Sequence, residues 1–104
     1  YGPIGPWFVT RDEVPDPQAL DLWLEVNDKR HQDGNTRTMI FPVSKIVSYL
    51  SQCMSLQPGD VIATGTPPGV GQGMKPPIYL KAGDRVRLSV EGLGTQQQTV
   101  VESK

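Results

Sequence analysis

Apolar and polar side chains alternate along the segment from Leu20 to Val26. The apolar members are Leu20, Leu22, Leu24 and Val26. This period of two is typical of a half-buried β-strand, because a helix would scatter the same residues around its circumference. Glu25 lies on the opposite side of the alternation, and we expect it to be solvated.

A turn pair, Asn27-Asp28, follows this strand and precedes the polar residues 29–32. This order predicts a β-hairpin whose second strand is exposed and carries His31. We expect the hairpin to end at Asp33-Gly34.

Helical spacing replaces the alternation after Pro42. Apolar residues then recur at intervals of three and four, at Val43, Ile46, Val47, Leu50, Cys53 and Met54. The pattern predicts an amphipathic helix of about three turns, with proline at or near its first turn. We expect the helix to pack its apolar stripe on a sheet, which would bury Cys53 as a small hydrophobic residue.

Further β-favouring runs lie on both sides of this helix. They are Trp7–Thr10, Val61–Ala63, Asp84–Glu91 and Thr95–Val101, the last two joined as a hairpin by Gly92-Leu93-Gly94. The predicted fold class is therefore α+β, mainly β, with one helix.

Composition limits the architecture further. The chain has 104 residues, enough for one small domain, and 37% of them are hydrophobic, so a packed core is expected. Glycine and proline number 11 and 10, together about a fifth of the chain, against an ordinary share of roughly 12% for the pair. This excess excludes a helical bundle.

Charge and cysteine content limit the classes of binding partner and the cellular compartment that we expect. Ten basic against 11 acidic residues give a net charge of −1, which offers no basic field for nucleic acid. A single Cys and a single His exclude an internal disulfide and a Cys/His zinc cluster and favour a reducing, cytoplasmic setting. No apolar run is long enough to span a membrane and no signal peptide is visible. The first residue is not Met, and we expect a truncated or processed chain.

The Gly/Pro-rich loop Thr64–Gly73 is the strongest candidate for a ligand contact, because short side chains let a ligand approach backbone N–H groups and Thr hydroxyls. Its spacing fits neither a Walker motif nor a dinucleotide fingerprint, since Pro76-Pro77 stands where a hydroxyl residue or a helix is needed. The alternative is that these glycines only turn the chain between strands.

No other residue forms a recognisable catalytic group. The 11 acidic residues contain no E-x-E or D-x-D pair, whereas hard cations need convergent carboxylates. Asp60 and Asp84 each follow a glycine and are expected to stabilise turns. His31 has no partner at a telling spacing and is interpreted as a surface residue, and Lys75 and Lys81 as solvated loop residues.

Taken in order, these segments closely resemble the C-terminal part of the fumarylacetoacetate hydrolase family. The matching motifs are Gly5-Pro6-Trp7, Val26-Asn27, Gln32-Asp33-Gly34-Asn35-Thr36, Met39-Ile40-Phe41, Pro58 through Pro67, Gly69-Val70-Gly71, Gly83-Asp84 and Glu91-Gly92-Leu93-Gly94. The Thr-Gly-Thr-Pro segment at 64–67 is the most specific of them.

The resemblance implies a metal-dependent enzyme that acts on acylpyruvates and related 2-oxo or enol acids by hydrolysis, decarboxylation, isomerisation or lyase chemistry. A Mg²⁺ or Mn²⁺ ion would chelate and polarise the substrate. Among the residues of this chain, Thr66 would bind the substrate, Gly65 would leave room for its approach, and Thr64 is a third substrate-binding candidate. The family's members are usually homodimers.

The family's metal ligands and its catalytic lysine lie upstream of the segment that matches Gly5-Pro6-Trp7, so no catalytic or metal-binding residue is assigned within residues 1–104. The chain is interpreted as the C-terminal portion of one catalytic domain with a mixed β-roll or sandwich fold, inactive by itself. The alternative from another functional class is a noncatalytic β-rich binding or assembly module.

Overall fold

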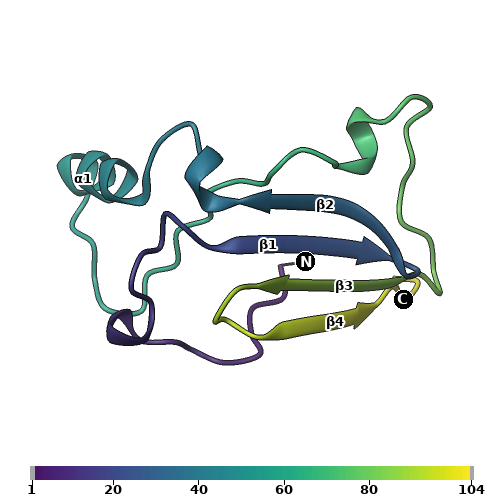
Figure 1. The fold of residues 1–104 in the computed structure, drawn as a ribbon, viewed down its shortest axis with the longest axis horizontal. Helices are drawn as coiled ribbons and strands as arrows, with labels where there is room; N and C mark the ends of the chain where they lie inside the picture. The colour runs from purple at the N-terminus through teal and green to yellow at the C-terminus, as the bar shows by residue number, and fades with distance from the viewer. Residues whose placement is uncertain (1, 104) are drawn as a thin grey trace.

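The computed structural model describes residues 2–103, which contain one antiparallel sheet of four strands ordered β2-β1-β3-β4 (Figure 1). The strands are β1 (Asp21–Val26), β2 (Lys29–Asn35), β3 (Arg85–Val90) and β4 (Thr95–Thr99). The helical elements of this range are α1 (Val43–Cys53) and the short 3-10 helices η1 (Arg11–Glu13), η2 (Thr36–Thr38) and η3 (Gly71–Gly73). The predicted class, α+β and mainly β with one amphipathic helix, is confirmed.

The hairpin predicted from the alternation joins β1 and β2. Asn27 and Asp28 have φ angles of 50° and 63°, the left-handed values that a type I′ turn needs and that Asn and Asp tolerate better than most residues. β2 continues to Asn35, past the predicted end of the hairpin, while β4 stops at Thr99 instead of Val101.

A β-bulge interrupts β2. Leu24 pairs with Gln32, but Glu25 pairs with Arg30, so His31 is the extra residue between them. Residues opposite each other in a ladder lie on the same face of the sheet. The bulge therefore places Gln32 on the face of Leu24 and Arg30 on the other face.

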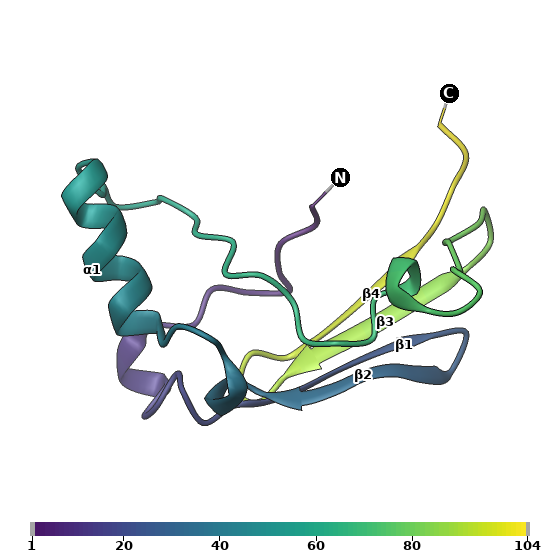
Figure 2. The same cartoon turned by 90° about the horizontal axis from the view of Figure 1, so that it is seen from above.

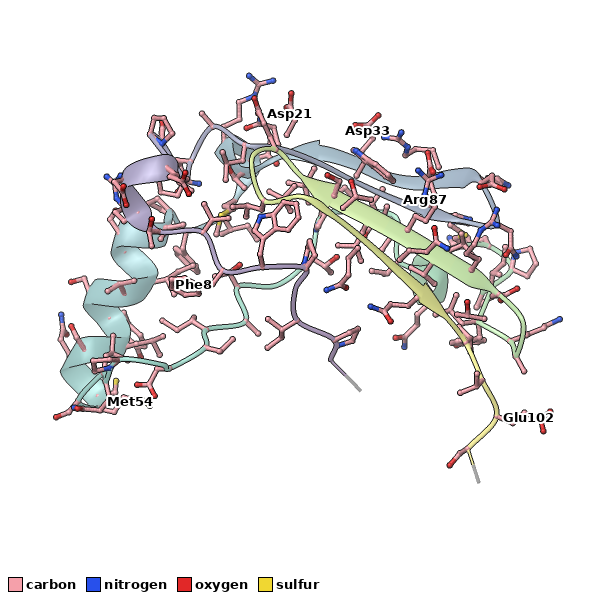
Figure 3. All side chains as sticks on the ribbon, turned by 90° about the horizontal axis from the view of Figure 1, so that it is seen from below. Phe8, Asp21, Asp33, Met54, Arg87 and Glu102 are labelled. Carbon is pink, nitrogen blue, oxygen red and sulfur yellow. The ribbon has the colours of Figure 1, made fainter. Side chains whose placement is uncertain are left out.

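The face that carries Arg30 holds a charged cluster around Trp23. Its member Arg87, on β3, is labelled in Figure 3. The guanidinium groups of Arg30 and Arg87 lie 4.6 and 5.7 Å from the centre of the Trp23 ring. Both also pair with Glu25, at 3.0 Å from Arg30 and 3.6 Å from Arg87. The Glu25 side chain is only 16% exposed, so the expectation of a solvated Glu25 is wrong, because arginines from β2 and β3 cover it.

The helix α1 follows Pro42 and ends at Cys53, as its spacing predicts. It stands to one side of the sheet (Figure 2), and its first turn is tied to the segment before β1 by the Val43 N–H, which donates to Gln18 Oε1 at 2.9 Å. The prediction that the helix packs on the sheet is wrong, and so is the predicted burial of Cys53, which is exposed. Periodicity identifies an apolar stripe but not the surface that covers it.

Two predicted strands are absent from the sheet. The segments Trp7–Thr10 and Val61–Ala63 are not assigned as strands in the described part of the chain. Their side chains are largely open to solvent, with Phe8 89% and Val61 73% exposed. A β-favouring run becomes a strand only where its backbone groups find a partner strand, and here neither run does.

Within residues 2–103 no apolar side chain is buried, and Gln32 is the one buried residue. The radius of gyration is 15.4 Å, whereas a compact domain of this length has about 13 Å. The accessible surface is 8368 Å², against about 5,800 Å² expected for its mass. The expected packed core is therefore not formed by these residues alone.

Candidate functional site

The Gly/Pro-rich loop Thr64–Gly73 runs alongside β2 (Figures 1 and 2), and three contacts hold it there. Gly69 has a φ of +113°, and a Cβ atom added there would collide with the carbonyl of His31, the bulge residue. Pro67 lies against Gly34 further along β2. The glycines therefore do more than turn the chain, because they allow the loop backbone to lie directly on the strand.

The third contact is made by the Gln32 side chain, which holds the middle of the loop. Its Nε2 group donates to Thr66 Oγ1 and to the Pro67 carbonyl, both at 2.7 Å. Gln32 is 8% exposed, so these two bonds satisfy a buried amide group that would otherwise be costly. The interpretation of residues 29–32 as an exposed strand is thus wrong at Gln32.

Of the three predicted substrate-binding residues, the structure connects Thr66 to the sheet. Thr66 remains exposed while its hydroxyl is held by Gln32. Gly65 and Thr64 are also exposed in the same loop. Gly65 has a φ of +97°, and the space that a Cβ atom would occupy there is open. All three side-chain positions are therefore open to an incoming molecule.

A pocket of about 240 Å³ lies beside this contact, between the loop and the sheet. Its walls are mainly apolar and come from β1, β3, the loop and the segment Ile78–Leu80. His31, Gln32, Tyr79 and Asp84 contribute the ionisable or strongly polar side chains of the wall. Thr66 is outside the wall and reaches it through Gln32.

Asp84 serves the turn before β3, as predicted. Its Oδ1 accepts from the Asn27 amide at 2.9 Å and its Oδ2 from the Lys81 N–H at 2.8 Å. These two donors hold the pKa of the Asp84 carboxyl below its ordinary value of 3.8. Asp60 has the same role in the turn of residues 57–60, where its Oδ2 accepts from the Gln57 N–H at 2.7 Å.

A divalent metal ion does not fit the residues described here by themselves. No group of three or more His, Cys, Asp or Glu side chains between residues 2 and 103 converges on a point where a cation could bind. A search of the same residues for an apolar helix long enough to cross a membrane finds none.

Gln32 is the residue of this site that sequence reasoning missed. It is polar and sits in a polar run, so its neighbours suggest exposure. Only the bulge at His31 turns it toward the loop. The one available signal was its place in the Gln-Asp-Gly-Asn-Thr motif, which has no charge or spacing that predicts a hydrogen bond to residue 66.

Relatives of known structure share this fold. The maleylpyruvate hydrolase of Sphingobium sp. SYK-6, solved in complex with manganese(II) and pyruvate, is 42% identical over 96% of this chain, with a TM-score of 0.85. The fumarylacetoacetate hydrolase of Exiguobacterium antarcticum is 46% identical over 97% of this chain, with a TM-score of 0.93. The chain covers 35% and 36% of these two proteins.

Sequence comparison leads to the same group. A Burkholderia multivorans protein, named provisionally as a hydrolase, is 72% identical over 99 residues, which are 94% of this chain and 35% of that protein. The chain thus spans about a third of the length of the relatives it matches. Residues 1–101 match the family described as "Fumarylacetoacetate (FAA) hydrolase C-terminal". The chain therefore belongs to the fumarylacetoacetate hydrolase family, as the order of its motifs indicates.

Proposed function

We propose that this chain is the C-terminal portion of a single catalytic domain in a divalent-metal-dependent enzyme that acts on acylpyruvate-like 2-oxo or enol acids. The observation that carries the proposal is the likeness to the maleylpyruvate hydrolase solved with manganese(II) and pyruvate, because it extends over 96% of this chain at 42% identity. The large exposed apolar surface supports the structural half of the proposal, since a self-contained domain would cover it.

In this proposal the loop Thr64–Gly73 provides the substrate contacts of the chain. Thr66 offers an exposed hydroxyl in a fixed position. Gly65 leaves space beside that hydroxyl, and Thr64 offers a second one on the same loop. Such groups suit the oxygens of a small carboxylic acid, which accept hydrogen bonds.

The metal, Mg²⁺ or Mn²⁺, would be held by ligands outside this chain, because the described residues provide no cluster of ligands for it. When bound, such an ion polarises the oxygens of a 2-oxo acid as a Lewis acid. This chain's own part is to bind and orient the substrate from the loop. By itself it should therefore bind substrate weakly and leave it unchanged.

The proposed reaction is a hydrolysis, decarboxylation, isomerisation or lyase reaction, as in the rest of the family. Its solved members include both a maleylpyruvate hydrolase and a 2-hydroxyhepta-2,4-diene-1,7-dioate isomerase from Mycobacterium marinum, 42% and 45% identical to this chain. We further propose a homodimeric, cytoplasmic protein. The exposed apolar residues support an assembly, and a single cysteine suits a reducing compartment.

A turnover assay tests the proposal. The full-length protein and the 104-residue chain are each offered a panel of acylpyruvates, with Mg²⁺, with Mn²⁺ and with a chelator. We expect metal-dependent turnover by the full-length protein and none by the chain. Turnover that survives complete chelation would exclude the metal-dependent enzyme, and inactivity of the metal-loaded full-length protein on the whole panel would favour the noncatalytic binding module.

A further inference from the structure

Gln32 is the one buried residue among residues 2–103, and its side chain ends at the proposed substrate loop. The Pro67 carbonyl oxygen can only accept a hydrogen bond, so the group that faces it at 2.7 Å must be the NH₂ of Gln32 and not its oxygen. That assignment also fixes the second bond of the same nitrogen, which goes to Thr66 Oγ1.

The direction of the second bond determines what the Thr66 hydroxyl can do. A hydroxyl both donates and accepts, but an NH₂ group only donates, so Thr66 Oγ1 must accept from Gln32. Among residues 2–103, the hydroxyl proton then has one acceptor, the Pro67 carbonyl at 3.3 Å. This distance exceeds the roughly 2.5–3.0 Å of an ordinary O–H···O bond, so the proton is available to a better acceptor.

From these contacts we propose that Gln32 is a positioning residue that makes the Thr66 hydroxyl a hydrogen-bond donor to the substrate. The inference rests on the proposed role of Thr66 and deepens it. A loop prepared in this way binds oxygens that only accept, such as those of a carboxylate or an enolate. It discriminates against a group that can only donate at the same place, such as an amide NH₂ or an ammonium group.

A purely structural role for Gln32 is the competing explanation. Gly69 and Gly34 also hold the loop on β2, so Gln32 could simply add one more attachment. The two explanations differ in one respect. An attachment affects stability whether or not Thr66 has a hydroxyl, whereas a positioning residue affects ligand binding only through that hydroxyl.

A double-mutant cycle in the full-length, Mn²⁺-loaded protein separates the two explanations, with pyruvate as the probe and its dissociation constant as the readout. We expect Thr66→Val to weaken pyruvate binding about tenfold, and Gln32→Ala to weaken it by about three- to tenfold. The double variant should bind within about twofold of Thr66→Val alone, because the second change then has no hydroxyl left to act on.

Gln18→Ala is the matched control. Gln18 also bridges two segments, since its amide donates to the Thr36 carbonyl at 2.5 Å and its oxygen accepts from the Val43 N–H. It makes no bond to the loop, so its loss should lower the melting temperature and leave pyruvate binding unchanged. Should Gln32→Ala fail to fold, Gln32→Glu preserves the shape of the side chain but replaces the NH₂ donor with an oxygen, and it enters the same cycle.

Three results would overturn the inference. If folded Gln32→Ala, or Gln32→Glu in its place, binds pyruvate normally, Gln32 positions nothing. If the losses of the two single variants multiply in the double variant, Gln32 acts independently of Thr66, and the substrate role of Thr66 survives. If Thr66→Val alone has no effect, the role proposed for Thr66 fails, and Gln32 has nothing through which to act.

Discussion

At the scale of single residues, the contact between the loop and β2 depends on the absence of a side chain at Gly69 as much as on the side chain of Gln32. Gly69 brings the loop backbone against the carbonyl of His31, and its φ of +113° is one that side chains rarely adopt. Gln32 then donates hydrogen bonds to Thr66 Oγ1 and to the Pro67 carbonyl. The position of the Thr66 hydroxyl is thus set by two residues on β2 and one in the loop.

Gly69→Ala should destabilise the full-length protein by at least about 2 kcal/mol, because the new methyl group meets backbone that cannot rotate away and the φ angle becomes strained. Chemical denaturation measures the loss. Gly59→Ala is the matched control, since Gly59 has a φ of +95° but open space around a new Cβ. A loss at Gly69 no larger than at Gly59 would show that the loop does not lie against His31.

Thr66→Val should lower kcat/KM of the full-length enzyme by about 10- to 100-fold, the effect of losing one hydrogen bond worth about 1.5–3 kcal/mol to a charged acceptor. Steady-state kinetics on an acylpyruvate measures it. Thr66→Ser keeps the hydroxyl and should stay near the wild-type value. Unchanged kinetics for Thr66→Val would remove this residue from the site.

At the scale of elements, the sequence identifies those whose pattern is local. The alternation of Leu22, Leu24 and Val26 and the helical spacing of residues 42–54 both predict the observed element. The segments Trp7–Thr10 and Val61–Ala63 lack a partner within the described residues, so propensity alone predicts strands that do not form here. The bulge at His31 follows from pairing between strands and has no signal in the alternation.

The candidate site, too, is predicted only where its pattern is local in the sequence. The Thr-Gly-Thr-Pro motif predicts a substrate-binding role for Thr66, because the order and spacing of its residues resemble those of the family. Gln32 escapes prediction because its burial depends on a one-residue shift in register and on a loop that is distant in sequence. The turn role of Asp84 is predicted because its bond from the Lys81 N–H reaches only three residues along the chain. Its bond from the Asn27 amide joins two turns that are distant in sequence and has no local signal.

The turn before β3 also predicts a pH dependence. The Asn27 amide and the Lys81 N–H lower the pKa of Asp84 in the folded state, so the stabilisation that the carboxylate provides is present above its unfolded pKa, near 3.8, and is lost as pH falls through the lower folded value. Asp84→Asn should therefore be less stable at pH 6 and lose less stability than wild type between pH 4 and pH 2. Denaturation curves across this range measure both effects.

Asn27→Ala provides the cross-check, because it removes the side-chain donor that lowers the pKa of Asp84 and should change the acid limb of the stability curve in the same direction. An acid limb that is identical in wild type and both variants would show that this turn does not contribute to the pH dependence.

At the scale of the whole molecule, the residues form a sheet and a helix without enclosing a core. The apolar side chains that face solvent lie on segments far apart in sequence, among them Phe8 at 89%, Ile40 at 90% and Val61 at 73% exposed. So many exposed large apolar side chains are uncommon on a free-standing protein of this size. The relatives are about three times as long as this chain, and we propose that the remainder of such a protein covers these segments.

Hydrogen–deuterium exchange tests whether the rest of the full-length protein covers these segments. In the 104-residue chain, residues 7–10 and 61–63 should exchange rapidly, because they belong to no strand of the described sheet. In the full-length protein both segments should be protected, since β-favouring runs acquire backbone partners when the rest of the domain is present. The paired strands β1 and β3 are the internal reference and should be the slowest-exchanging segments of both proteins. Rapid exchange of residues 7–10 and 61–63 in the full-length protein would show that the rest of the domain does not cover these segments.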